Sequence, residues 1–411
     1  MLIRWILILA FTALVQLYAF QAVKTLTSNR TLYWVYWIIV IGILLLFYGQ
    51  SMFYDRSRGF SSFMSYTLGL FFSLFLFQSF LIVFLFLEDI IRFPQAVYRY
   101  LTNQGSQEIL PQRRKFISQI ALGLAAIPFS ALLFGMVRGK YNYKVLKYTL
   151  EFEDLPEAFD GFTLAQISDI HSGSFDNPEK VAYGVDLVNQ QQADVILFTG
   201  DIVNNKTDEL YPYQSIFTKL SAPMGVYSIL GNHDYGDYTD WENDAAKRQN
   251  LEDLKRTQKE MGFRLLLNES VTLEKGSDKI SLVGVENWGA GRFKKAGDLE
   301  KALSQVEATD FKILMSHDPS HWEAQVLPHP FPIHLTLSGH THGMQFGIDI
   351  PGVIKWSPIQ WRYKQWAGIY DQQKQYLNVN RGFGYLAYPG RVGMWPEISL
   401  ITLKKKEIGI S

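Results

Sequence analysis

The chain of 411 residues contains no cysteine, which excludes disulfide bonds, thiolate zinc sites and cysteine nucleophiles. It also has no formal net charge, because 39 basic residues balance 39 acidic ones. Nucleic-acid binding needs a basic surface, and the sequence shows no basic stripe, so we expect no nucleic-acid partner. Neither a P-loop nor a G-x-S-x-G motif is present. Any metal ion must therefore be held by nitrogen and oxygen ligands.

The length of the chain exceeds what one hydrophobic core usually absorbs, and nearly all its long uncharged runs lie before residue 137. We therefore expect a transmembrane region over residues 1–140. The first span shows no convincing cleavage site and further spans follow it, so we interpret it as a retained helix rather than a signal peptide. Four segments approach or exceed the roughly 20 apolar residues that cross a bilayer: 2–20, 32–53, 60–87 and 116–136.

The orientation of these spans is not decided by charge, because the basic residues on the two sides are equal in number. The sequence Arg113-Arg114-Lys115 immediately before the fourth span is similar to a twin-arginine export signal. We therefore expect a multi-pass protein of the bacterial inner (plasma) membrane with its catalytic domain on the extracytoplasmic side. The alternative is that the basic doublet merely flanks a span.

After residue 150 the pattern changes to short β-type runs separated by polar, helix-like stretches, which is typical of an α/β domain. We expect a linker and lead-in strand over 141–160 and a catalytic domain over 161–405. Five apolar runs each end in polar residues. The residues that follow these runs are Asp169 and His171, then Asp201, then Asn232, His233 and Asp234, then His317, and finally His340 and His342.

The carboxyl ends of sheet strands are where α/β folds build their sites, so we expect these side chains to converge. Carboxylate, carboxamide and imidazole ligands together suit Mn, Fe or Zn, and a carboxylate can bridge two ions. Asp201 is the natural bridge in a site for two divalent metal ions. Such a pair activates water and clamps the oxygens of a phosphate ester. Gly200, Gly231 and Gly339 fit tight turns that bring the backbone close to the ions.

The order D-x-H, G-D-x-x-N, G-N-H-D, H, G-H-x-H resembles the calcineurin-like metallophosphoesterases. The match runs from about Leu155 to Leu403 and is similar to the membrane-anchored bacterial branch, including twin-arginine-exported phosphodiesterases and UDP-diacylglucosamine hydrolases. The resemblance implies a β-sandwich flanked by helices, so the expected architecture is a bundle of about four transmembrane helices plus this sandwich.

The resemblance also implies the roles of the candidate residues. It implies that His233 stays off the metals and contacts the phosphate or protonates the leaving oxygen, while Asp234 orients it. Such an imidazole next to a carboxylate would stay charged near neutral pH. The first metal would be held by Asp169, His171, Asp201 and His342, and the second by Asp201, Asn232, His317 and His340.

We therefore expect a membrane-bound hydrolase that cleaves phosphomonoesters or phosphodiesters of a small-molecule or lipid substrate by a metal-bridging hydroxide. Two alternatives stay open. A cytoplasmic domain would favour a UDP-diacylglucosamine-type pyrophosphate hydrolase of lipid A synthesis, and a metal-free domain would favour a non-catalytic membrane scaffold or sensor. The aromatic residues between Trp356 and Tyr370 suit a substrate cap, a membrane contact or ordinary packing.

Overall fold

The computed structural model describes residues 2–59, 61–102, 111–350 and 352–406. The chain divides into two compact units. Unit 1 comprises Met1–Tyr54 and Phe63–Met136, and unit 2 comprises Asp55–Ser62 and Val137–Ser411. Phe60, where the third span was predicted to begin, lies outside the described residues.

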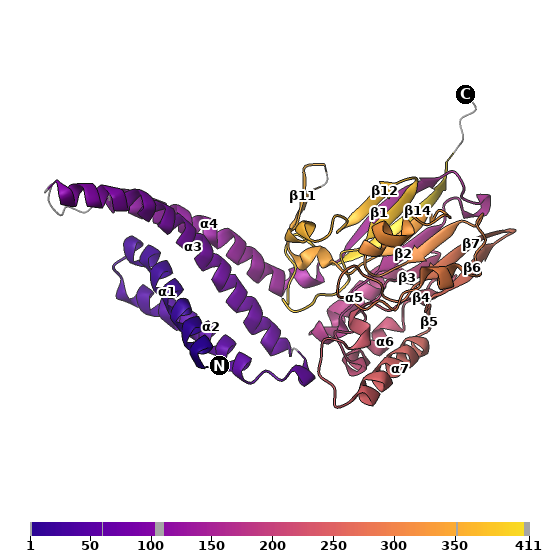
Figure 1. The fold of residues 1–411 in the computed structure, drawn as a ribbon, viewed down its shortest axis with the longest axis horizontal. Helices are drawn as coiled ribbons and strands as arrows, with labels where there is room; N and C mark the ends of the chain where they lie inside the picture. Colours follow the sequence, from indigo (N-terminus) through magenta and orange to yellow (C-terminus); the bar gives the residue numbers. More distant parts are fainter. Residues whose placement is uncertain (1, 60, 103–110, 351, 407–411) are drawn as a thin grey trace, which may run out of the picture. The chain divides into compact units, whose positions relative to one another are not determined.

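Unit 1 consists of four long apolar helices, as predicted, and each is long and apolar enough to cross a membrane. They are α1 (Leu2–Leu26), α2 (Arg30–Met52), α3 (Ser62–Leu101) and α4 (Pro111–Val137) (Figure 1). The helices meet through small side chains, which allow close approach in an apolar medium. Ala19 and Ala22 of α1 share a buried cluster with Leu81 of α3 and Ala121 of α4. Gln16 donates to Gln78 across 2.9 Å, so these two intramembrane amides satisfy one another.

Helix α3 continues well past Leu87, where the third span was predicted to end. The acidic residues Glu88 and Asp89 follow directly after Leu87, and their carboxylates have a partner inside unit 1. Arg114 Nη1 lies 3.1 Å from Glu88 Oε2 and 2.5 Å from Asp89 Oδ1. The helix continues to Leu101, so α3 is longer than the apolar run from which the span was predicted. Arg114 of the doublet therefore forms ion pairs within unit 1, and the side of the membrane on which unit 2 lies stays a prediction.

Unit 2 contains two six-stranded mixed sheets (Figure 1). The first has the order β1-β14-β2-β3-β4-β5 and the second the order β12-β13-β9-β8-β7-β6, while β10 and β11 form a separate hairpin. The strands are β1 (Lys144–Phe152), β2 (Thr163–Ile167), β3 (Val195–Phe198), β4 (Val226–Ser228), β5 (Phe263–Leu265), β6 (Glu269–Lys275), β7 (Asp278–Gly284), β8 (Lys312–Met315), β9 (Leu335–Ser338), β10 (Ile348–Ile350), β11 (Ile354–Trp356), β12 (Gly368–Gln372), β13 (Gln375–Val379) and β14 (Glu397–Lys405).

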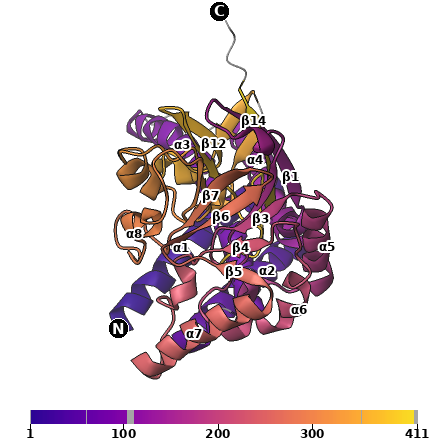
Figure 2. The same ribbon diagram turned by 90° about the vertical axis from the view of Figure 1, so that its right-hand side faces the viewer.

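The two sheets pack face to face and are covered by helices on their outer faces, which confirms the predicted flanked β-sandwich. Strand β3 shows why the sequence takes this form. Val195 and Leu197 point into the core between the sheets, while Ile196 and Phe198 pack under the helices of the first sheet. A strand buried on both faces reads as a continuous apolar run. The helices of the first sheet are α5 (Pro178–Asn189), α6 (Gln214–Phe217) and α7 (Asp244–Glu260), with α8 (Leu299–Leu303) on the opposite side (Figure 2).

The strand pairing places the ends of the five predicted runs at one edge of the sandwich. Strands β2, β3 and β4 are parallel neighbours in the first sheet, and β8 and β9 are parallel neighbours in the second. Parallel neighbours end at the same edge of a sheet. The loops that leave these five strands carry all of the candidate site residues.

Candidate metal centre

Two groups of buried or half-buried ligand atoms lie at this edge. Each group has its atoms within 4.8 Å of one another, and the groups are Asp169, His171 and His342 in one and Asp201, His317 and His340 in the other. Asp201 joins them, because its Oδ2 lies 3.1 Å from His317 Nε2 and 3.6 Å from His171 Nε2. The Oδ1 atom of Asn232 lies 2.8 Å from His340 Nδ1. The structure thus brings together all seven residues that the sequence predicts as ligands, while their role as ligands stays a prediction.

Hydrogen bonds determine which imidazole nitrogen of each histidine is left for a metal. His317 Nδ1 lies 2.7 Å from the carbonyl of Thr199, which can only accept, so Nδ1 carries the proton. His171 Nδ1 donates in the same way to Asn204 Oδ1 over 3.1 Å. The Nε2 atoms of both rings therefore present lone pairs to the space between the clusters. In most metal-binding histidines one ring nitrogen likewise donates a hydrogen bond that holds the ring, while the other nitrogen binds the metal.

The donor set fits divalent ions. His317 Nε2 is buried, and it lies 3.1 Å from Asp201 Oδ2 without a well-directed hydrogen bond among the described residues. His171 Nε2 and His342 Nε2 lie 3.0 Å apart, an approach that needs a proton or a cation between the two lone pairs. Imidazole, carboxylate and carboxamide donors without sulfur suit Mn, Fe or Zn. The residues present therefore satisfy the chemistry expected of a binuclear centre.

The charges of the cluster attract a cation. Burial lowers the pKa of His171 well below its usual value, which favours the neutral form that binds metals. At His317, burial opposes the charged form, but the neighbouring Asp201 and Asp169 outweigh it and raise the pKa to about 10. Without a metal, a proton on His317 neutralises Asp201. A metal ion that binds these carboxylates would displace that proton.

Five of the seven predicted ligands have a left-handed backbone, with φ of 51° at Asp169, 48° at His171, 59° at Asp201, 70° at His340 and 52° at His342. This conformation is uncommon for residues other than glycine, and each instance costs on the order of 1–3 kcal/mol. It persists only where surrounding contacts enforce it. One such contact is the backbone N–H of His340, which donates to Asp169 Oδ2 over 3.0 Å.

The three predicted turn glycines lie against ligand side chains. A Cβ atom at Gly231 would stand 2.2 Å from Asp201 Oδ1, and one at Gly339 would stand 2.2 Å from Asp169 Oδ2. At Gly200, with φ of 94°, it would stand 2.5 Å from the backbone nitrogen of Gly231. These glycines are therefore required by the close approach of the backbone to the ligands themselves.

The expected contact between Asp234 and the imidazole of His233 is wrong. His233 Nδ1 instead lies 2.8 Å from the carbonyl of Asn204. The carboxylate of Asp234 is buried and accepts the backbone N–H groups of Gly231 and Asp201 through Oδ2, at 2.8 and 2.9 Å. These hydrogen bonds of Asp234 therefore hold the loops after β3 and β4 together. It positions Asp201 and does not orient His233.

The charged form of His233, which a neighbouring carboxylate can favour, is opposed by burial of the ring. Burial is the largest influence and lowers the pKa of His233, with His342 and His317 acting in the same direction. Asp201 and the Asn204 carbonyl act against this but do not outweigh it. These surroundings favour the neutral form of His233, in which Nδ1 carries the proton and Nε2 has a lone pair.

Two residues behind His340 complete the centre and were not identified from the sequence. The hydroxyl of Tyr363 lies 2.8 Å from His340 Nε2 and donates to Asp318 Oδ2 at 3.4 Å. If a metal bound Nδ1, which lies 2.8 Å from Asn232 Oδ1, the proton of His340 would lie on Nε2 and be held by Tyr363. Burial raises the pKa of Tyr363, so its hydroxyl stays neutral. Tyr363 lies in the predicted aromatic stretch and is buried there with Trp366, whereas Trp361 is 78% exposed.

Replacing Tyr363 by phenylalanine is expected to weaken metal binding roughly 10- to 100-fold, because it frees the ring of His340 to reorient. Metal titration of the full-length variant by calorimetry measures this. The matched control is Tyr370→Phe, which removes a hydroxyl that accepts the backbone N–H of Trp366 in the same stretch. Equal affinities for the two variants would show that Tyr363 does not position His340.

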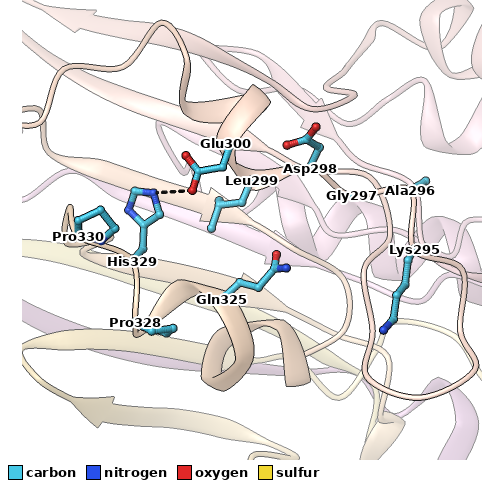
Figure 3. A pocket seen from close by; sticks show the side chains of 10 residues that line it. All are labelled: Lys295, Ala296, Gly297, Asp298, Leu299, Glu300, Gln325, Pro328, His329 and Pro330. Carbon is cyan, nitrogen blue, oxygen red and sulfur yellow. Dashed lines mark ion pairs between the residues drawn. The ribbon is translucent and has the colours of Figure 1, made fainter.

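A surface pocket of about 550 Å³ lies beside α8 (Figure 3). It contains none of the predicted ligands. Two of its ionisable residues lie close together, since His329 Nε2 is 3.4 Å from Glu300 Oε1. We therefore assign the chemistry to the ligand cluster rather than to this pocket.

Comparison with known proteins agrees with this geometry. A family model described as "Calcineurin-like phosphoesterase" matches residues 162–344, a range that contains all seven predicted ligands as well as His233 and Asp234. A second model, described as "Probable Calcineurin-like phosphoesterase, transmembrane domain", matches residues 3–140. The two matches correspond to the sandwich and to the four apolar helices.

The chain is also similar to individual relatives. The uncharacterized metallophosphoesterase YkuE of Bacillus subtilis is 31% identical over 303 residues, which cover 71% of this chain and 97% of YkuE. YkoQ of the same organism is 25% identical, over 68% of this chain and 97% of YkoQ. A transmembrane protein with metallophosphoesterase domain from Danio rerio is 29% identical over 66% of this chain, and the chain spans only 60% of that relative. The chain belongs to the calcineurin-like metallophosphoesterases, in the membrane-anchored branch with a four-helix transmembrane domain.

Proposed function

We propose that this membrane protein is a metal-dependent phosphoesterase that hydrolyses phosphomonoesters or phosphodiesters at the candidate metal centre. The observation that carries the proposal is the meeting of two ligand clusters at Asp201, whose Oδ2 approaches a histidine of each cluster. One carboxylate placed between two sets of nitrogen and oxygen donors is the arrangement that holds two divalent ions close together.

In this proposal each ion has four protein ligands. Two ions held by these residues would lower the pKa of a bound water and polarise the phosphoryl oxygens. The chain's contribution is to hold the donors still, through Thr199, Asn204 and Tyr363 behind the imidazoles. The first set is Asp169, His171, Asp201 and His342, and the second is Asp201, Asn232, His317 and His340.

His233 acts on the substrate rather than on the ions. The Asn204 carbonyl holds its Nδ1–H and leaves Nε2 available. A neutral imidazole accepts a proton when an anionic group arrives, because a nearby negative charge raises its pKa. The incoming phosphate would thus bring His233 into its charged form. Nε2–H can then bind a phosphoryl oxygen and pass its proton to the leaving oxygen.

We propose the bacterial inner membrane as the location of the protein, with the catalytic unit on the extracytoplasmic side. The support is the position of the Arg113-Arg114 doublet directly before the apolar part of α4. The phosphorylated substrate would then be a lipid or another envelope component. The test is a reporter that is active only in the cytoplasm, fused to the C-terminus. Activity of this fusion would contradict the proposed orientation.

The test is hydrolysis by full-length protein in detergent or vesicles, stripped of metal and reloaded with Mn, Fe or Zn. We expect metal-dependent cleavage of p-nitrophenyl phosphate or bis(p-nitrophenyl) phosphate. A nucleotide diphosphate sugar in the same panel examines the pyrophosphatase alternative. Absence of both bound metal and hydrolysis would overturn the proposal in favour of a non-catalytic scaffold or sensor.

A further inference from the structure

Exposed aliphatic side chains of unit 2 are concentrated in one short segment. Among the described residues after Val137, the large aliphatic side chains that are exposed all lie between Met344 and Ile354. Single exposed apolar residues are ordinary, but a contiguous group on a soluble face indicates an interaction surface. The group consists of Met344, Ile348, Ile350, Val353 and Ile354, and the 78% exposed ring of Trp361 follows it.

The β10–β11 hairpin separates these residues onto one of its two faces. Opposite residues in an antiparallel pair share a face, so Ile350 and Ile354 lie together on one side. The other side carries Asp349 and Lys355. Asp349 pairs with Arg381, and the ammonium of Lys355 donates to a backbone carbonyl. The polar face is thus held against unit 2, while Ile350 and Ile354 on the apolar face are exposed.

The base of the hairpin lies close to the residues that follow the last membrane span. Phe346 forms a β-bridge with Val392, the neighbour of Arg391. A Cβ at Gly139 would stand 2.2 Å from the Arg391 carbonyl oxygen, so these backbones touch. Helix α4 ends at Val137, and two residues of chain reach at most about 7 Å. The end of a span lies at the bilayer surface, which places the base of the hairpin near that surface.

The second connection to the spans meets unit 2 at the edge that carries the ligands. The segment between α2 and α3 is part of unit 2, where Thr239 Oγ1 donates to the Arg56 carbonyl over 2.8 Å. Arg56 Nε donates to the Tyr238 carbonyl over 3.3 Å. The hydroxyl of Tyr238 in turn accepts from Asn232, a predicted ligand, at 2.9 Å. Arg391 at the first connection likewise contacts His342.

We propose that the apolar face of the β10–β11 hairpin, together with Trp361, inserts into the surface of the bilayer that holds the four spans. Both chain connections bring this edge of unit 2 to the membrane, and the hairpin supplies the apolar surface. The exposed cation Arg362 beside Trp361 complements anionic headgroups, whereas the exposed ammonium of Lys364 pairs with Glu323 at 3.3 Å. An exposed tryptophan next to basic residues is typical of interfacial segments. The insertion does not depend on the proposed hydrolysis.

Because the chain lacks cysteine, a single introduced cysteine reports one position. Full-length Val353→Cys, labelled with a bimane fluorophore, is reconstituted into phosphatidylcholine and phosphatidylglycerol vesicles. Part of the lipid carries a nitroxide on a shallow acyl carbon. Interfacial elements bury roughly 5–10 Å into the headgroup and acyl boundary. We expect the nitroxide to quench most of the bimane emission at Val353→Cys. The emission should also be shifted to the blue relative to the same fluorophore in water.

The matched control is Ser277→Cys in the exposed turn between β6 and β7, which we expect to be unquenched. Adding Ile350→Asp to Val353→Cys should abolish the quenching without changing the melting temperature. Equal quenching at positions 353 and 277 would overturn the proposal. A blue shift that grows with the protein-to-lipid ratio but is insensitive to the nitroxide would also overturn it, since a second copy would then cover the face.

Discussion

Replacing Asp201 by alanine is expected to lower kcat/KM for a phosphodiester by more than about 10³-fold, since metal-ion catalysis is worth several kcal/mol and about 1.4 kcal/mol is tenfold. The change removes the one carboxylate that approaches both clusters. It also removes the acceptor of the backbone N–H of His233, at 2.8 Å. The bound metal per chain, measured by mass spectrometry, should fall with the activity.

The matched control for this variant is Asp310→Ala. The side chain of Asp310 is only 11% exposed and accepts from Ser281, but it lies outside the ligand loops. We expect the control to keep its metal and its activity, even if it melts at a lower temperature. Retention of more than about a tenth of wild-type activity by Asp201→Ala, a loss below 1.4 kcal/mol, would show that Asp201 does not bridge the centre.

Replacing His233 by alanine is expected to lower kcat by about 10²- to 10⁴-fold, the usual contribution of a positioned acid or base. Metal content should not change, because the ring of His233 is held by the Asn204 carbonyl rather than by the ligand clusters. The loss should be greater for a poor alkyl leaving group than for a nitrophenyl group. A good leaving group departs without a proton, so it depends less on Nε2–H.

The control for this second variant is His329→Ala, which removes an imidazole at the surface pocket. Its activity should equal that of the wild type with both leaving groups. If His233→Ala lost the same factor for alkyl and nitrophenyl esters, His233 would not be the proton donor. If it also lost metal, His233 would have to be counted among the ligands.

The sheet edge that carries the predicted ligands could be predicted from the sequence, because each signal lies within one short stretch of chain. Val195 to Phe198 is an apolar run followed by a polar loop, and the same pattern recurs at four other strands. Parallel pairing then places the loop residues at one edge. Gly231 and Gly339 also mark positions where the backbone must approach a ligand.

The contacts behind the ligands could not be predicted, because they join residues that no local pattern relates. Tyr363 reaches His340 from an irregular loop, and nothing in the aromatic stretch distinguishes it from Tyr370. Asn204 was visible within the G-D-x-x-N motif, but its double contact with His171 and His233 requires the folded loops. The contact of Arg114 with Asp89 likewise joins residues that lie 25 positions apart in the chain.

The left-handed backbone at five of the seven predicted ligands has an evolutionary consequence. At each of these positions glycine would relieve the conformational cost, whereas aspartate and histidine are kept there for their side chains. A copy of this chain released from selection for hydrolysis would gain stability by drifting to glycine at positions such as 169, 201 or 342. Glycine at those places in a relative would therefore mark a protein that has abandoned the reaction while its fold became more robust.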